Sequence, residues 1–329
     1  MRRREFIALL GGVVAPLACV RSGLAQPRTK PYRIGILETI SPSLNAANLA
    51  GFRQGMQELG YVEGRDTILE YRSADGASER FPALASELVA LGVDVIVTRG
   101  TPAAIAAKTA TSTIPIIMAA IGEPIGPGVV AQLARPGGNV TGLSAFVTEL
   151  HGKRIELMKE MLPSTKRVGA LLNMGNPVVP PQWRETQTAA RALQLEAELL
   201  DVRNSSDIEL AFRRAVEARV DAIAVGPDAV TQVNRRRIAE LAAAHRIAAI
   251  YPSKEFVEDG GFASYGVNYP HLYFRAAGFV DSVLKGSKPG DLPVQQPTKF
   301  EFVINLKAAK MIGVEVPSLL LARADEVIE

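Results

Sequence analysis

The sequence predicts an α/β protein in which two doubly wound parallel-sheet lobes are joined by a hinge. Short runs of β-branched residues alternate with amphipathic segments from residue 32 onward, which is the pattern of βαβ units. Several of these runs are almost continuously apolar, as expected for parallel strands that are covered on both faces. The second half of the chain repeats strand sequences of the first half in the same order. A length of 329 residues also exceeds what one hydrophobic core usually supports.

The first half of the chain is predicted to alternate strands with helices. The expected strands cover residues 32–37, 67–72, 93–98 and 114–119, and the expected helices cover residues 45–59 and 81–91. Leu49, Phe52 and Met56 recur at helical spacing and therefore give the first helix an apolar face. Gly92 follows the last apolar position of the second helix and is expected to end it.

Three strand sequences of the first half return in the second half. Residues 33–37, 93–97 and 114–117 correspond to residues 167–171, 220–224 and 247–250. Short runs of valine and isoleucine resemble one another by composition alone, which is the alternative explanation. The matched positions, Gly35 with Gly169 and Asp94 with Asp221, favour a true repeat. Self-similarity over such a long period predicts two lobes of similar topology.

The second half adds a long C-terminal tail to this repeat. Helices are expected over residues 150–161, 180–193, 271–285 and 306–312, with a proline-rich connection over 286–297 and a strand over 300–305. The junction between the lobes is expected near residues 146–148. The tail is too long to cap a single lobe, so we expect it to return to the first lobe and to end on the second.

The net charge of +3 is concentrated at the N-terminus. Residues 1–25 contain four arginines and one glutamate, so the remainder of the chain is formally neutral. This distribution argues against a protein that binds nucleic acid through an overall positive charge, and no nucleic-acid partner is expected.

The first 25 residues have the composition of an export signal. A basic stretch at residues 2–4 precedes an apolar stretch at residues 8–18 and a small-x-small sequence that ends at Ala25. Residues 3–7, RREFI, resemble the twin-arginine motif that bacteria use to export folded proteins. We therefore expect a twin-arginine signal peptide, cleavage after Ala25 and a periplasmic mature protein. The alternatives are a basic segment that stays on the protein and a lipoprotein anchored through Cys19.

The chain has few residues that could form a metal centre or a catalytic site. Cys19 is the only cysteine, and His151, His245 and His271 lack the spacing of zinc ligands. The GxGxxA match at residues 126–131 follows a fourth strand rather than a first one, so it is interpreted as a turn. The sequence contains no GxSxG, P-loop or HExxH motif. We therefore expect a protein without catalytic activity, metal or cofactor.

Polar side chains follow several of the predicted strands. Because ligands of open parallel sheets bind beyond the carboxyl ends of the strands, these positions define a candidate cleft between the lobes. The candidate ligand-binding residues are Thr39, Ser41, Arg99, Gly100, Thr101, Gly122, Glu123, Ser144, Asn173, Asn176, Asp228, Tyr251 and Tyr265.

The segment Arg99-Gly100-Thr101-Pro102 predicts the start of a helix. Thr101 is expected to cap this helix, and Pro102 is expected to occupy its first position. The exposed N–H groups and the positive end of the helix dipole would then receive an anion such as a carboxylate. The alternative is a cap that serves stability alone. Arg99 is expected to pair either with a ligand carboxylate or with Glu123.

Five runs of sequence carry a family resemblance. They are GFRQGMQELGY at residues 51–61, GTPAA at 100–104, LARPGGNVTGLS at 133–144, LPVQQPTKFEFVINLK at 292–307 and LARADEVI at 321–328. With these runs the chain resembles, over its whole length, the bacterial ABC-transporter substrate-binding family that includes tryptophan- and tyrosine-type binding proteins. The resemblance implies the type I periplasmic-binding-protein fold, with a hinge that the chain crosses three times. The implied lobes are residues 32–147 plus 269–296 and residues 148–268 plus 297–329.

The same resemblance implies a function in transport. The mature protein, expected to be a monomer, would close on a small carboxylate-bearing ligand such as an amino acid and deliver it to the ABC transporter permease subunits. Thr101 would hold the carboxylate, Arg99 or Glu123 would recognise ligand charge, and Tyr251 or Tyr265 would flank an apolar part.

Two departures from the family pattern leave the ligand open. Arg99 stands where many members have a small or hydroxyl residue, and Glu123 stands where aspartate is frequent. If both side chains face the cleft, the ligand is expected to differ from a simple aromatic amino acid. The alternatives to a transport function are a ligand sensor that acts on a receptor and a periplasmic hydrolase built on the same layout.

Overall fold

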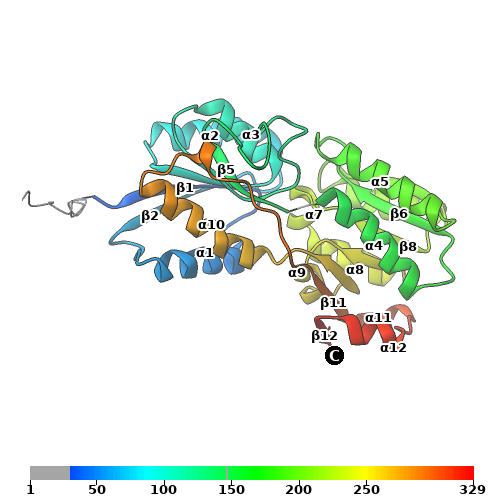
Figure 1. Cartoon of the computed structure of the whole chain (residues 1–329). Coiled ribbons are helices and arrows are strands. Elements are labelled where there is room, and N and C mark those ends of the chain that lie inside the picture. Colours follow the sequence, from blue (N-terminus) through cyan, green and yellow to red (C-terminus); the bar gives the residue numbers. More distant parts are fainter. Residues whose placement is uncertain (1–29, 146) are drawn as a thin grey trace, which may run out of the picture. The chain divides into compact units, whose positions relative to one another are not determined.

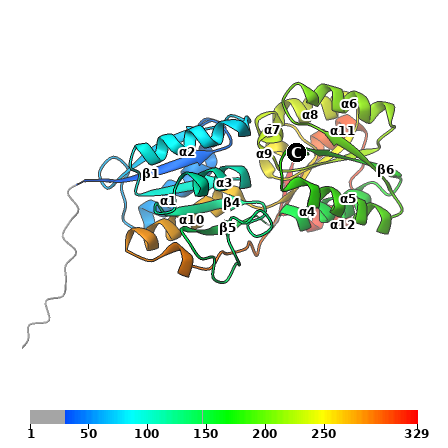
Figure 2. The same ribbon diagram turned by 90° about the horizontal axis from the view of Figure 1, so that it is seen from above.

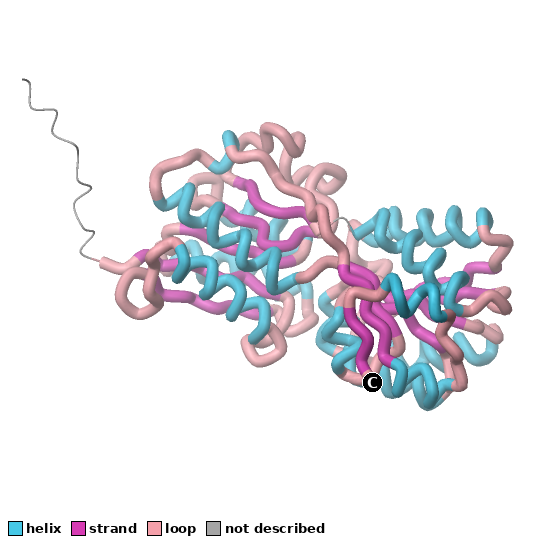
Figure 3. Tube along the Cα trace, turned by 60° about the horizontal axis from the view of Figure 1, so that its bottom comes forward, coloured by secondary structure: helices cyan, strands magenta, loops and turns pink. Residues whose placement is uncertain are grey.

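The computed structural model describes residues 30–145 and 147–329. The predicted signal peptide, its cleavage after Ala25 and Cys19 lie outside these residues. Two sheets organise the described part of the chain, and Figure 3 shows the strands of each sheet with helices packed around them. Within the described ranges, no helix combines the length and the apolar composition needed to cross a bilayer.

The first sheet has five parallel strands in the order β2-β1-β3-β4-β5 (Figure 1). The strands are β1 (Tyr32–Glu38), β2 (Thr67–Ser73), β3 (Val95–Arg99), β4 (Ile116–Ile121) and β5 (Val140–Ser144). The helices between them are α1 (Ala46–Glu58), the short η1 (Ser78–Arg80), α2 (Phe81–Ala90) and α3 (Thr101–Ala110). This sheet and the helices packed on it are called the first lobe below.

The second sheet has seven strands in the order β12-β11-β10-β9-β8-β6-β7. Figure 1 labels β6, β8, β11 and β12 of this sheet. The strands are β6 (Arg167–Leu172), β7 (Glu196–Asp201), β8 (Ala222–Val225), β9 (Ala248–Tyr251), β10 (Ala263–Gly266), β11 (Glu301–Asn305) and β12 (Glu326–Ile328). The helices of this half are α4 (Val147–Met161), α5 (Val179–Ala192), α6 (Asp207–Glu217), α7 (Ala229–Val233), α8 (Arg235–Ala244), α9 (Lys254–Glu258), α11 (Leu306–Ile312) and α12 (Ser318–Arg323). This sheet and these helices are called the second lobe.

The two sheets confirm the predicted fold class. In each lobe the first strand lies between the second and the third, as β2-β1-β3 and as β7-β6-β8, which makes both sheets doubly wound. One pairing departs from the parallel expectation, because β10 and β11 run antiparallel. Before β11 the chain passes through α10 (Tyr269–Leu284) and η2 (Pro289–Asp291), and it then joins the second sheet in the opposite direction.

The two matched aspartates, Asp94 and Asp221, make equivalent contacts in the two sheets. Asp94, just before β3, accepts a hydrogen bond from the N–H of Arg33 at 2.7 Å, and its own N–H donates to the Arg33 carbonyl at 2.8 Å. Asp221, just before β8, makes the same two contacts with Arg167, at 2.9 Å each. Each carboxylate therefore satisfies a backbone donor at the start of the central strand, which would otherwise lack a partner.

Helix α10 packs against α1 of the first lobe although it follows the second lobe in sequence (Figures 1 and 2). The two backbones approach closely at two glycines of α1. A Cβ atom at Gly51 would lie 2.3 Å from the carbonyl oxygen of Pro270, and one at Gly55 would lie 2.5 Å from that of Phe274. This packing agrees with a return of the tail to the first lobe, while the boundaries of the lobes stay a prediction.

The Gly55→Ala substitution is expected to lower the free energy of unfolding by about 1–3 kcal/mol, because the added methyl group would force α1 and α10 apart. Gly278→Ala on α10 is the matched control, since a Cβ there meets nothing within 4 Å. That change is expected to stabilise the protein by about 0.5–1 kcal/mol through helix propensity. Urea denaturation of the two variants measures both values, and equal unfolding midpoints would contradict the close packing of α1 and α10.

Candidate ligand-binding site

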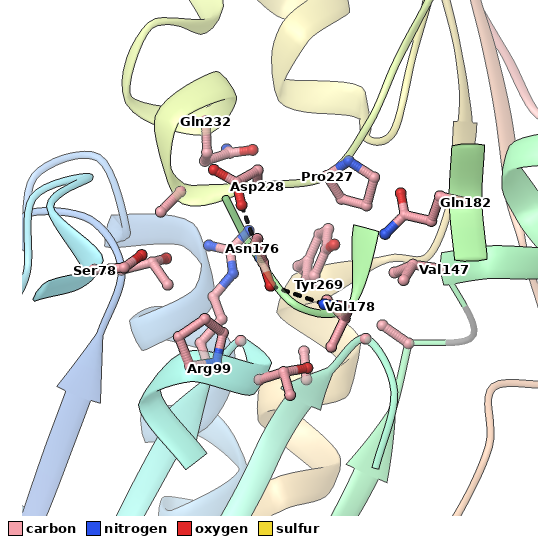
Figure 4. Close-up of a pocket in the computed structure, with 18 of the residues that line it drawn as sticks. Ser78, Arg99, Val147, Asn176, Val178, Gln182, Pro227, Asp228, Gln232 and Tyr269 are labelled. Carbon is pink, nitrogen blue, oxygen red and sulfur yellow. Dashed lines mark hydrogen bonds between the residues drawn. The ribbon is translucent and has the colours of Figure 1, made fainter. Parts of the chain in front are cut away.

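One pocket is lined by residues that follow strands of both sheets (Figure 4). It brings together seven of the residues predicted from the sequence, namely Thr39, Arg99, Gly100, Thr101, Gly122, Asn176 and Asp228. The first five come from the first lobe and the last two from the second lobe, so the pocket lies where the strand ends of both lobes meet.

Helix α3 begins in this pocket, one residue earlier than the sequence suggests. The prediction of Thr101 as the cap is wrong, because Gly100 is the N-cap and Thr101 is already helical. Gly100 has φ of 81° and ψ of 148°, a conformation that side chains strongly disfavour. The predicted helix start is nevertheless present, and the first-turn N–H groups of Thr101 and Ala103 point out of the helix without intrahelical partners. These donors and the helix dipole favour an anion.

Arg99 is the main cation on the first-lobe side. Its side chain is buried, with only 6% of its surface exposed, and its guanidinium carbon lies 4.3 Å from the ring centre of Tyr269. The Nη1 atom has no hydrogen-bond partner in the part of the chain that the structure describes. A buried guanidinium nitrogen without a partner is costly, so a ligand oxygen at this point would be strongly favoured.

A buried carboxylate, Glu38, lies behind Arg99 at the end of β1. The Tyr273 hydroxyl donates to its Oε1 atom, and the N–H of Thr39 donates to its Oε2 atom at 3.1 Å. Burial raises the pKa of Glu38 from 4.5 to about 7, although the charge of Arg99 acts to lower it. Glu38 directly precedes the predicted residue Thr39 at the end of this strand, but it was not among the candidate ligand-binding residues.

The raised pKa of Glu38 predicts a pH dependence of stability. Between pH 4.5 and 7 the folded protein keeps a proton that the unfolded chain has released. The resulting stabilisation is therefore fully present below pH 4.5 and is lost as the pH rises through 7. Relative to Glu38→Gln, the ligand-free protein should lose on the order of 3 kcal/mol between pH 4.5 and pH 8. Urea unfolding of both proteins across this range measures the difference, and parallel pH profiles would contradict the prediction.

Asp228 is the acidic group on the second-lobe side of the pocket. Its Oδ1 atom accepts hydrogen bonds from the Asn173 amide and the Val230 N–H, both at 2.9 Å, and its Oδ2 atom accepts from the Asn176 amide at 2.8 Å. Burial raises the pKa of Asp228 above its ordinary value, while these hydrogen bonds act in the opposite direction. All three donors are neutral, so they orient the carboxylate without balancing its charge.

Several pocket residues were missed by the sequence analysis. They are Ser78, Phe81, Gln182, Gln232 and Tyr269 among others. Most of them lie inside helices rather than directly after strands, so a search of strand ends could not find them. Tyr269 is the first residue of α10 and directly follows Asn268. The side-chain oxygen of Asn268 caps this helix by accepting a hydrogen bond from the N–H of His271 at 2.7 Å. The place of Tyr269 next to the predicted hinge crossing near residue 269 was the one signal available.

Three predicted residues of the first lobe are not among those that line the pocket. The Oε1 atom of Glu123 accepts hydrogen bonds from the N–H groups of Ile125 and Gly126, at 2.8 and 3.3 Å, so this side chain closes a turn. Ser41 is bound to Ser43, with 3.0 Å between their hydroxyl oxygens. Ser144 is buried at the end of β5. The pairing of Arg99 with Glu123, considered from the sequence, is therefore not the arrangement found.

Three predicted residues of the second lobe also lie outside the pocket lining. Asn173 stays close to it, because its amide binds Asp228. Tyr251 is 1% exposed and its ring stacks on Phe256, with 5.0 Å between the ring centres. The ring of Tyr265 packs against that of Phe300, with 6.0 Å between the ring centres. The backbone carbonyl of Tyr265 accepts a hydrogen bond from the buried side chain of Arg154. Tyr251 therefore belongs to the core of the second lobe, whereas the half-buried Tyr265 packs against apolar residues of both lobes.

The described residues contain no group of histidine, cysteine, aspartate or glutamate side chains arranged to hold a metal ion. What the pocket offers is a cation and free N–H groups on one side, an acid on the other, and apolar surface from residues such as Phe81 and Val178. Two α/β lobes with such a pocket at their strand ends define a protein that binds a small polar molecule.

Comparison with known proteins identifies the class further. The profile of the ABC transporter substrate binding protein family matches residues 33–328. A tyrosine-binding protein of Clostridioides difficile (strain R20291) is 29% identical over 301 residues, which cover 90% of this chain and 86% of that protein.

Two solved structures have the same fold. An ABC domain from Streptococcus pneumoniae in complex with L-Trp is 31% identical, with a TM-score of 0.83 over 91% of this chain and 100% of that chain. A conserved domain protein of Vibrio cholerae O1 biovar El Tor is 29% identical, with a TM-score of 0.85 over the same shares.

The chain belongs to the ABC transporter substrate binding protein family. The resemblance seen in the five sequence runs is thereby confirmed, together with the type I periplasmic-binding-protein fold. Membership in this family also confirms the expectation of a binding protein rather than an enzyme.

Proposed function

We propose that this chain is an exported solute-binding protein of an ABC importer. It binds an α-amino acid in the pocket where the strand ends of the two lobes meet, and it delivers this ligand to the permease subunits. The observation that carries the ligand class is the separation of charges in the pocket. Arg99 and the start of α3 lie on the first-lobe side, and the carboxylate of Asp228 lies on the second-lobe side.

The ligand carboxylate fits the first-lobe side. Arg99 offers a buried Nη1 atom without a partner, and α3 begins beside it with Thr101, whose N–H group has no partner within the helix. The helix that begins on the opposite side, α5, is a poor anion site by comparison. Pro180 and Pro181 fall in its first turn and have no N–H group to donate.

The ligand ammonium group fits Asp228. The carboxylate is held in place by neutral donors, so a cationic ligand group would supply the missing charge. Burial makes this carboxylate unfavourable when it is ionised alone, and pairing with an ammonium group would offset that cost. A zwitterion spanning Arg99 and Asp228 would therefore satisfy both sides of the pocket at once.

The relatives support an amino acid as the ligand. One carries the name tyrosine-binding protein, and another was solved with L-Trp. Phe81 and Tyr269 provide apolar surface beside the proposed zwitterion site. A signal peptide of twin-arginine type, a periplasmic location and a monomeric state complete the proposal, as inferred from the leader sequence and the requirements of a permease.

A thermal-shift screen of the 20 common L-amino acids tests this proposal, with simple sugars and dicarboxylates as the comparison set. At a concentration about 100-fold above the dissociation constant, a true ligand should raise the melting temperature by about 5 °C. Uptake by vesicles that contain the cognate permease tests delivery. No shift with any amino acid, together with a clear shift for a sugar, would refute the proposed ligand class.

A further inference from the structure

One side chain of the pocket takes no part in the zwitterion site. Gln182 lies in the first turn of α5 and is fully buried, with 0% of its surface exposed. Neither its Nε2 atom nor its Oε1 atom has a hydrogen-bond partner in the described part of the chain. A buried amide that lacks both partners is rare, because each unmade hydrogen bond costs free energy.

The position of Gln182 is fixed by its surroundings. The helix holds its backbone, since its carbonyl accepts a hydrogen bond from the Thr186 hydroxyl at 3.0 Å. The side-chain amide lies beside the turn after β8, where a Cβ atom at Gly226 would be 3.4 Å from Oε1. Val147 and Pro227 flank it in the pocket, and neither side chain can form a hydrogen bond with it (Figure 4).

Gln182 and Arg99 are at opposite ends of the pocket. Figure 4 shows Arg99 and Ser78 on one side and Gln182 with Val147 on the other, with Asp228 and Asn176 between them. A ligand whose carboxylate is bound at Arg99 and whose ammonium group is bound at Asp228 would therefore direct its side chain toward Gln182.

We propose that Gln182 is a specificity-determining residue that binds a polar group at the tip of the ligand side chain. An amide both donates and accepts, so the group that matches it is a hydroxyl or an amide, which can do the same. The ligand class is therefore amino acids with a hydroxyl or amide tip, preferred over their apolar counterparts of equal size. This inference rests on the proposed function, because the zwitterion site sets the direction of the side chain.

The test uses pairs of amino acids that differ little in shape but differ in this polar group. The pairs are threonine with valine, asparagine with leucine, and tyrosine with phenylalanine. Calorimetry gives the dissociation constants of the unaltered protein first. In the pair that binds most tightly, the polar member should bind at least about tenfold more tightly, because its apolar counterpart leaves the buried amide without partners.

The variant Gln182→Leu then tests whether Gln182 is the residue that causes this preference. It should bring the two members of the pair to within about twofold of each other, mainly by improving the binding of the apolar member. Gln54→Leu is the matched control, since Gln54 is an exposed residue of α1 bound to Glu58, and it should keep the preference of the unaltered protein.

Three outcomes would overturn the inference. Equal binding of the polar and apolar members by the unaltered protein would show that no polar tip is recognised, whether or not the variant folds. An unchanged preference for the polar member in Gln182→Leu would show that another residue recognises the polar group of the ligand. No binding of any amino acid would refute the proposed function and this inference with it, whereas binding without discrimination refutes the inference alone.

Discussion

Arg99→Ala should weaken binding of the amino-acid ligand by about 100-fold. The guanidinium is buried, and its Nη1 atom has no other hydrogen-bond partner in the described structure, so its bond to the ligand carboxylate would form with little competition. Removing one partner of a buried charge pair costs about 2–5 kcal/mol. Calorimetry at pH 6 is the measurement of choice, because Glu38 is then largely protonated and the loss of its cationic neighbour costs little stability.

Arg236→Ala is the matched control for this effect. The Arg236 side chain is 81% exposed and forms an ion pair with Glu240 on the same helix, at 3.6 Å. Its removal should leave both the affinity and the melting temperature nearly unchanged, because exposed pairs of this kind contribute little. If Arg99→Ala kept the affinity of the unaltered protein, the ligand carboxylate would have to be bound elsewhere.

Asp228→Asn should weaken ligand binding by a comparable factor, about 30- to 1000-fold, through loss of the charge that faces the ligand ammonium group. The substitution also places an amide where Oδ2 accepts a hydrogen bond from Asn176 at 2.8 Å, so two donors would face each other. We therefore expect a moderate loss of stability, about 1–2 kcal/mol, alongside the large loss of affinity. Calorimetry and thermal unfolding measure the two effects separately.

Asp221→Ala separates affinity from stability. This carboxylate accepts hydrogen bonds from the N–H groups of Lys166 and Arg167, at 2.7 and 2.9 Å, at the start of β6 and away from the pocket lining. The variant should lose stability to a similar extent and keep the affinity of the unaltered protein. If both aspartate variants lost affinity equally, the effect of Asp228→Asn would reflect stability rather than contact with the ligand.

The fold could be predicted from the sequence because its signals are local or repeated. The apolar strand runs and the helical spacing of Leu49, Phe52 and Met56 depend on neighbouring residues alone. The matched aspartates, Asp94 and Asp221, recur because each holds the same pair of strands. The antiparallel pairing of β11 was missed, since it depends on the path of the chain after α10.

The candidate site was predicted in part, and the reason lies in side-chain direction. Arg99, Thr101 and Asp228 follow strands and point into the pocket, as the rule for parallel sheets anticipates. Tyr251 and Tyr265 occupy equivalent positions in sequence, yet the ring of Tyr251 packs inside the second lobe and that of Tyr265 packs against Phe300 and Phe302. Successive side chains of a strand point to opposite faces, and which face borders the pocket depends on the packing of the whole lobe.

The role of Gln182 at the far end of the pocket could not be predicted from the sequence. Gln182 is one of several glutamines, and its position in a helix gives no sign that it faces a ligand. Its significance comes from complete burial without a hydrogen-bond partner, which only the three-dimensional arrangement reveals. The same holds for Glu38, whose burial behind Arg99 raises its pKa.

The two charged contacts with the ligand are tested most directly by comparing three forms of the amino acid that binds best. Calorimetry would measure the dissociation constants of the L-amino acid, its carboxamide and its analogue without the amino group. The carboxamide and the deamino analogue should each bind about 100-fold more weakly than the amino acid, since each loses one of the two charged contacts at Arg99 and Asp228. Equal affinity of all three forms would contradict a zwitterion bound between these two residues.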